Sequence, residues 1–236
     1  MRTHATARLL VALLLGGPVA ARGAEPLPSF AHCDADTAAR LEFIETRLEA
    51  RRQYADIWWK GWLGGYAVGT VVESVLAGRE DDTGRRADYV VSAVKALGGT
   101  VRVYLDPPPA RTGADAMREV APVDAAACRE RLAIGERQLR ANADDTASRW
   151  SWKRHAANVG INVAGGIIVA EGFDESRGWA SMGVGIAVGE AMILSRPWHG
   201  DDDLAEYDRR FNAAAPSRVS IGVAPWGQGA RLVVRF

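Results

Sequence analysis

The sequence predicts a mainly α-helical protein in which two repeated antiparallel helical hairpins form a four-helix core with amphipathic flanking helices, followed by a short C-terminal β-hairpin. Three observations carry this prediction. The order of features in one half of the chain recurs in the other half, glycines lie four apart inside apolar segments, and residues 217–236 alternate between apolar and polar types.

Residues 1–23 have the composition of a signal peptide. A basic start that includes Arg2 precedes an unbroken apolar run at residues 9–15. Small residues follow, and cleavage is expected after Ala21 or after Gly23. The run is too short to cross about 30 Å of hydrocarbon. We therefore expect an exported protein of the cell envelope, located in the inner membrane or the periplasm.

Charge and composition exclude one class of partner. The chain has 29 basic and 29 acidic residues, so its formal net charge is zero. Acids and bases are interspersed, and no basic surface of the kind that binds nucleic acid is expected. The 25 glycines are in excess of the usual share of about 7%, and they lie inside apolar segments rather than in linkers.

The two predicted repeats span residues 33–110 and 125–198. A shift of about 91 positions places Arg40 on Arg131 and Trp59 on Trp150. Identity is only about one position in five, so the order of features is the stronger argument. Each block runs from a charged helix, through tryptophans, into an apolar small-residue helix, an acidic turn and a return helix closed by proline.

Helical spacing of apolar residues sets the expected elements. The first repeat is expected to contain helices at residues 36–54, 57–77 and 87–105, and the second at 125–143, 155–170 and 178–195. The short acidic turns make the helices of each hairpin antiparallel neighbours. The prolines at 107–109 and Pro197 end the hairpins, because proline has no amide and clashes with the preceding turn.

The C-terminal stretch has a period of two. Val219, Ile221 and Val223 alternate with polar or small residues, and Leu232 and Val234 do the same after a turn-forming segment at 225–229. This pattern predicts a β-hairpin.

Glycine stripes indicate where the helices pack. Glycine weakens an exposed helix by about 1 kcal/mol relative to alanine, so a series of glycines on one face suggests a gain from close contact between backbones. The predicted helix-packing positions are Gly61, Gly65, Gly69, Gly160, Gly185 and Gly189. Such interfaces are typical of helices in lipid, which favours transmembrane helices with membrane lipid as a partner. The stripes also suit a homo-oligomer or a contact with an envelope protein.

Polar residues inside the apolar helices favour the opposite interpretation, a water-soluble periplasmic bundle. A central charge costs about 2.5 to 3.5 kcal/mol on membrane insertion. The predicted buried polar residues are Glu73, Lys95, Arg102, Asn162 and Glu190. Counting outward from each turn, Glu73 and Lys95 fall at similar depth, as do Asn162 and Glu190, and we expect these two pairs to interact. Membrane embedding is the favoured alternative.

Cys33 and Cys128 precede the first helix of their repeats, and in an oxidising compartment they are expected to form a disulfide. The acidic runs near His32 and His199 are interpreted as solvated helix caps rather than metal ligands. No cofactor or metal site is predicted.

The sequence contains no catalytic triad order, phosphate-binding glycine loop or two-histidine helix spacing. The leading hypothesis is therefore a non-enzymatic, membrane-associated helical bundle of the cell envelope with a structural or assembly role. An alternative is a module that binds a lipid or other apolar ligand between the hairpins. A second alternative is an intramembrane enzyme that uses the carboxylates of Glu73 and Glu190.

Overall fold

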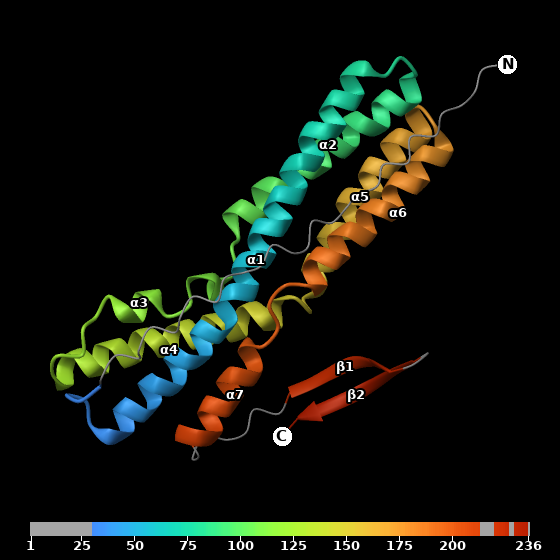
Figure 1. Cartoon of the computed structure of the whole chain (residues 1–236). Helices are drawn as coiled ribbons and strands as arrows, with labels where there is room; N and C mark the ends of the chain where they lie inside the picture. Colours follow the sequence, from blue (N-terminus) through green and yellow to red (C-terminus); the bar gives the residue numbers. More distant parts are fainter. Residues whose placement is uncertain (1–29, 213–219, 227–228, 236) are drawn as a thin grey trace.

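The computed structural model describes residues 30–212, 220–226 and 229–235 of the chain. The fold is mainly helical, which confirms the predicted class at that level. Figure 1 shows an elongated molecule with two parts. The first, which we call the body, contains the first half of α1 (Ala35–Arg79) together with η1 (Pro109–Thr112), α3 (Asp115–Arg118), α4 (Ala125–Ser148) and α7 (Gly200–Phe211). The second, which we call the arm, contains the second half of α1 with α2 (Thr83–Leu105), α5 (Trp152–Gly172) and α6 (Glu175–Leu194).

Helix α1 runs through both parts. It spans Ala35–Arg79, 45 residues without a break, and the Asp34 carboxylate caps its start by accepting a hydrogen bond from the Thr37 amide at 2.9 Å. The prediction of two helices, at 36–54 and 57–77, was wrong in this respect. Residues 55–57 contain neither glycine nor proline, so nothing stops the helix from continuing.

The arm consists of two helical hairpins. Helix α2 (Thr83–Leu105) packs against α1, and α6 (Glu175–Leu194) packs against α5 (Trp152–Gly172). Asp82 and Asp174 cap the two return helices through amides three residues on, in the acidic turns where capping is expected. Figure 1 shows the two hairpins side by side along the arm.

The two halves of the chain differ where the hairpins meet the body. Helix α4 spans Ala125–Ser148 and ends before α5 begins at Trp152, whereas the matching stretch of the first half is continuous inside α1. The order of helices follows the predicted repeat, but the geometry of the two halves is not the same. Their origin by duplication stays a prediction.

The body has its own core. The short helices η1 (Pro109–Thr112) and α3 (Asp115–Arg118), together with α4 and α7 (Gly200–Phe211), pack on the first half of α1. Its fully buried apolar side chains are Leu41, Ile44, Leu48, Met117, Leu139 and Tyr207. Helix α7 begins at the acidic run after His199, which the sequence predicted only as a cap in a loop.

Charged and covalent links join the elements of the body. Glu45 of α1 is fully buried and forms ion pairs with Arg131 of α4 and Arg118 of α3, each at 2.9 Å. Asp203 of α7 accepts two hydrogen bonds from Arg51 of α1, at 2.9 and 3.0 Å. The structure also joins Cys33 and Cys128 in the disulfide that the sequence predicts.

The C-terminal strands β1 (Ser220–Trp226) and β2 (Gly229–Arg235) pair antiparallel, with Ser220 opposite Arg235 and Trp226 opposite Gly229. The predicted signal peptide, residues 1–23, lies outside the described residues.

The transmembrane helices expected at 57–77 and 155–170 are not found. Within the part of the chain that the structure describes, no helix combines the length and the apolar character needed to cross a lipid bilayer. The charged, amide and hydroxyl side chains in these segments lower their hydropathy.

Candidate functional site

A chain of polar side chains runs through the interior of the arm between α5 and α6. His155 Nδ1 lies 2.6 Å from Glu190 Oε2, and its Nε2 lies 2.9 Å from the carbonyl oxygen of Arg149. The Asn158 amide donates to Glu190 Oε1 at 2.9 Å, and the Asn162 amide donates to Asn158 Oδ1 at 3.0 Å. Asn158 and Asn162 are each 7% exposed, so their amides are satisfied away from water, while the side chains of His155 and Glu190 are 28 and 26% exposed.

Lys95 of α2 extends this polar interior toward the tip of the arm. Its Nζ donates to the hydroxyl and the carbonyl oxygen of Ser181 on α6, at 3.2 and 3.4 Å. Burial lowers the pKa of Lys95, whereas Asp88 and Glu73 raise it. Burial also raises the pKa of Glu73, and the negative charge of Asp88 adds to that effect while Lys95 opposes it. Asp88 Oδ1 is buried without a hydrogen bond.

The structure partly supports the two predicted interior pairs. Glu73 and Lys95 influence each other electrostatically, but no ion pair of 4 Å or less joins them among the described residues. Asn162 reaches Glu190 only through Asn158. Arg102, the remaining predicted buried polar residue, lies elsewhere, near the body.

Three of the predicted packing glycines do lie in contacts, although not between backbones. A Cβ atom on Gly185 would overlap the side chain of Asn162, and one on Gly189 would overlap that of Asn158. A Cβ on Gly69 would lie 3.7 Å from that of Ala96, an ordinary contact. The two α6 glycines therefore make room for the asparagines of α5. The backbone contact of this hairpin is at Gly178, where a Cβ would meet Ala170 and the Gly166 carbonyl.

The prediction was wrong for the other three glycines. A Cβ on Gly61, Gly65 or Gly160 would meet no atom within 4 Å, and all three residues are exposed. These glycines lie on the outer surface of the arm rather than in its core. Four-residue spacing places residues on one face of a helix, but it does not say which way that face points.

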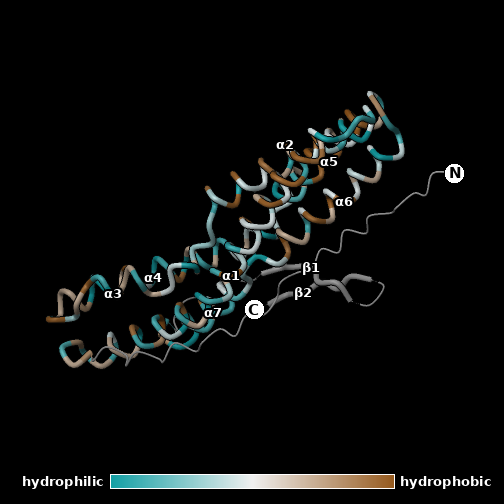
Figure 2. The backbone as a smooth tube through the Cα atoms, turned by 45° about the horizontal axis from the view of Figure 1, so that its top comes forward, coloured by the Kyte–Doolittle hydropathy of each residue, from teal (hydrophilic) through white to brown (hydrophobic). Residues whose placement is uncertain are grey.

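The outer surface of the arm is apolar on all four helices. Figure 2 shows the hydrophobic positions along the arm, most clearly on α2 and α5. Large aliphatic side chains there are 41 to 72% exposed; the examples are Val68, Val71, Val94, Leu105, Ile161, Ile168, Val184 and Val188. The interior of the arm thus holds buried asparagines as well as an apolar cluster of Trp58, Val103, Met192 and Ile193, while many aliphatic side chains remain exposed on its outer surface.

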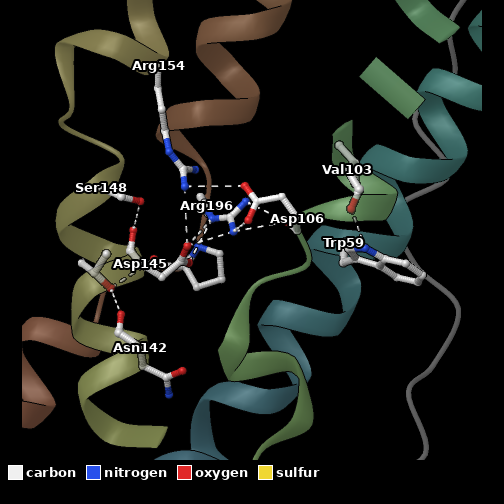
Figure 3. A network of polar contacts seen from close by, with 10 residues as sticks. Trp59, Val103, Asp106, Asn142, Asp145, Ser148, Arg154 and Arg196 are labelled. Atoms are coloured by element: carbon white, nitrogen blue, oxygen red, sulfur yellow. Dashed lines mark hydrogen bonds and ion pairs between the residues drawn. The ribbon is translucent and has the colours of Figure 1, made fainter. Parts of the chain in front are cut away.

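A second polar cluster lies where the arm meets the body (Figure 3). Arg196, which follows α6, is 4% exposed and donates from Nε to both oxygens of Asp145 on α4, at 3.0 and 2.9 Å. Its Nη2 lies 3.3 Å from Asp106 Oδ1 at the end of α2. Arg154 of α5 points into the same cluster, with Nη2 3.5 Å from Asp106 Oδ2. The cluster joins α2, α4, α5 and the segment after α6.

A pocket opens beside this cluster. Its charged lining is Arg102, Asp106, Arg154 and Arg196, and its apolar lining is Trp58, Val103, Met192 and Ile193. We call it the junction pocket. Arg196 also lies over the Trp58 ring, 5.3 Å from its centroid, and the Trp58 indole donates to the Ser195 hydroxyl at 3.0 Å.

Sequence reasoning identified only Arg102 among the charged residues of the junction pocket. Asp106, Arg154 and Arg196 lie at or beyond helix ends, where a charged residue is normally solvated. The sequence could have predicted their proximity, because Asp106, Arg154 and Arg196 each border an apolar helix at the same end of the arm. Antiparallel packing of these helices brings the three residues together.

Within the ranges that the structure describes, no group of three His, Cys, Asp or Glu residues is placed to hold a metal ion. The sequence matches no family model, no curated protein and no solved structure at a significant level.

Proposed function

We propose that this chain is an exported, non-enzymatic envelope protein that associates with a membrane through the apolar outer surface of its arm, in a structural or assembly role. The exposed aliphatic surface of the arm is the observation that carries the proposal. Aliphatic side chains such as Val94 and Val184 are 65 and 66% exposed, while Asn158 and Asn162 are buried.

The energetics of this surface favour a lipid environment. Each square ångström of apolar surface removed from water is worth about 25 cal/mol. A soluble monomer rarely exposes a contiguous apolar patch of more than a few hundred square ångströms. Here the exposed aliphatic side chains occur on all four helices of the arm, so a protein partner on one face would leave the others in water. Lipid contacts several faces at once.

The test is vesicle flotation of the mature protein with a matched pair of variants. Val94 in the arm and Val123 in the body are both 65% exposed, so Val94→Glu and Val123→Glu place the same charge at equal exposure. The wild type and Val123→Glu are expected to float with vesicles, and Val94→Glu is expected to bind more weakly. A wild type that stays at the bottom of the gradient, or equal losses in both variants, would overturn the proposal.

A second candidate function, self-association, is favoured by the outward-facing glycines. Gly61, Gly64 and Gly65 of α1 have open space beyond their Cα atoms, and glycine on an exposed helix is costly unless another backbone approaches it. Chemical cross-linking in mild detergent tests this candidate. A specific dimer that is lost in Gly65→Leu would support it, and a monomer in both proteins would contradict it.

The two remaining hypotheses gain no comparable support. The space between the hairpins is occupied by side chains, because Lys95 reaches Ser181 and the Cα region of Gly165. Glu73 and Glu190 have different partners, Lys95 and Asp88 for the first and His155 and Asn158 for the second. Binding of an apolar ligand there, and catalysis by these carboxylates, stay predictions.

A further inference from the structure

The junction pocket combines an excess of positive charge with apolar lining residues. Three guanidinium groups, from Arg102, Arg154 and Arg196, line it or border it, and two carboxylates, Asp106 and Asp145, lie against them. The formal sum at this site is one net positive charge, from three positive groups and two negative ones. Trp58, Val103, Met192 and Ile193 supply the apolar part of the lining.

Arg196 forms the shortest contacts with both carboxylates, those of Asp145 and Asp106. Arg196 takes both oxygens of Asp145 at 2.9 to 3.0 Å and also the Asp106 carboxylate at 3.3 Å. Arg154 is left with longer contacts, 3.5 Å to Asp106 and 4.0 Å to Asp145, beyond the 2.7 to 2.9 Å or so of a direct charge-assisted hydrogen bond. Arg154 therefore keeps donor capacity for a further anion.

The positive charge of Arg102 is compensated even less than that of Arg154. It lines the junction pocket from the last turn of α2, and no described residue forms an ion pair or side-chain hydrogen bond with its guanidinium. A cation at a helix C-terminus is favourable in itself, which accounts for the charge at this position. That effect does not account for a second partly buried arginine beside it. Burial lowers the pKa of Arg154, and the neighbouring Arg196 and Arg102 act in the same direction, whereas Asp106 and Asp145 raise it.

We infer that the junction pocket binds a phosphate-bearing anion, held by the guanidinium groups of Arg102 and Arg154. Planar guanidinium groups donate two parallel hydrogen bonds to phosphate oxygens, and incomplete exposure to water strengthens such contacts. The arrangement of the pocket suits an amphiphile. Half of its lining residues are apolar, and Leu105, which directly precedes Asp106 in the chain, is 72% exposed.

The phosphate has two possible sources, an anionic lipid head group or a free phosphate. The lipid source rests on the proposed membrane association, whereas the phosphate chemistry does not. In the lipid case the head group occupies the junction pocket while the acyl chains follow the apolar surface of the arm. The pocket would then select anionic phospholipids over zwitterionic ones.

The experiment uses the full mature chain and three single variants. Arg102→Gln and Arg154→Gln remove the proposed ligands, and Arg86→Gln removes an exposed arginine at the far end of the arm as the matched control. Flotation compares phosphatidylcholine vesicles with vesicles that contain phosphatidylglycerol. In parallel, calorimetric titration with inorganic phosphate at constant ionic strength measures the free anion. Circular dichroism checks the helix content of each variant, and Arg102→Gln breaks no ion pair with a described residue.

For a lipid ligand we expect wild type and Arg86→Gln to prefer phosphatidylglycerol vesicles at least tenfold, and Arg102→Gln and Arg154→Gln to lose that preference. For a free anion we expect saturable phosphate binding that weakens at least tenfold in the same two variants. The inference is overturned if neither probe shows such binding, or if Arg86→Gln weakens it equally. Flotation with phosphatidylcholine alone reports on the proposed function, so either proposal can fail while the other stands.

Discussion

At the scale of single residues, the body concentrates its buried charge on Glu45. This carboxylate is fully buried and contacts Arg131, which is itself 2% exposed, and the more exposed Arg118. Taking two charges out of water is costly, and their mutual attraction repays that cost only while both are present. Removal of one partner leaves the other as an uncompensated charge in the core.

Glu45→Gln is therefore expected to lower the free energy of unfolding by about 3 to 5 kcal/mol. Urea denaturation measures the loss, and Glu42→Gln, at an exposed position of the same helix, serves as the control and should change little. The double variant Glu45→Leu/Arg131→Met should recover most of the loss, because no unpaired charge remains. A Glu45→Gln protein as stable as Glu42→Gln would contradict this account.

Tyr207 gives the body a pH dependence in the alkaline range. Burial first, and then its hydrogen bond to Glu136 at 2.6 Å, raise the pKa of Tyr207 to about 12, while Arg40 acts in the opposite direction. Because the folded pKa lies above the unfolded value of 10.0, the contribution of Tyr207 to stability is complete below pH 10 or so. It is lost as the pH rises from about 10 toward 12.

An ultraviolet titration of phenolate absorbance measures this shift. The difference between wild type and Tyr207→Phe should show one tyrosine that ionises at about pH 12 in the folded protein. A difference curve centred at pH 10 would contradict both the burial of Tyr207 and its contact with Glu136.

At the scale of elements, apolar spacing predicts the hairpin helices well, because a helix buries one stripe wherever it packs. Boundaries were less predictable. Helix α1 continues through residues 55–57, whereas α4 ends at the matching residues 149–151. The sequence does not predict this difference, because neither stretch contains glycine or proline. Of the polar residues expected to be buried, Asn162 is buried, whereas Glu73, Lys95, Arg102 and Glu190 are only partly buried. The junction pocket was out of reach, because its charges come from separate elements that only the tertiary fold brings together.

Substitution of glycines in the arm distinguishes a glycine that packs inside the hairpin, Gly178, from one that faces outward, Gly65. Gly178→Ala is expected to destabilise the protein by about 1 to 3 kcal/mol, because the new Cβ would overlap Ala170 and the Gly166 carbonyl across the hairpin. Gly65→Ala is expected to stabilise the monomer by up to about 1 kcal/mol, because its Cβ meets open space and alanine favours the helix. Thermal unfolding followed by circular dichroism should show shifts of opposite sign, and shifts of the same sign would place the two glycines in similar surroundings.

At the scale of the whole molecule, α1 connects two parts that differ in chemistry. The body has an apolar core and charged links, whereas the arm combines a small apolar cluster with a buried polar chain and exposes many aliphatic side chains. A single continuous helix carries the chain from one to the other, and Arg196 binds Asp145 of the body and Asp106 of the arm. The junction is thus held by the continuous backbone of α1 and by the ion pairs of Arg196.

The Cys33–Cys128 disulfide closes a loop of 95 residues that includes the whole α1–α2 hairpin. Such a link restricts the unfolded chain, and for a loop of this length the chain-entropy contribution is about 4 to 5 kcal/mol, with measured effects commonly about 2 to 4 kcal/mol. We therefore expect reductant to lower the urea midpoint of the wild type by an amount that corresponds to at least about 2 kcal/mol. The double variant Cys33→Ser/Cys128→Ser should unfold at that lower midpoint with or without reductant. An unchanged wild-type midpoint under reducing conditions would mean that the body alone, through Glu45 and its arginines, already holds α1 and α4 together.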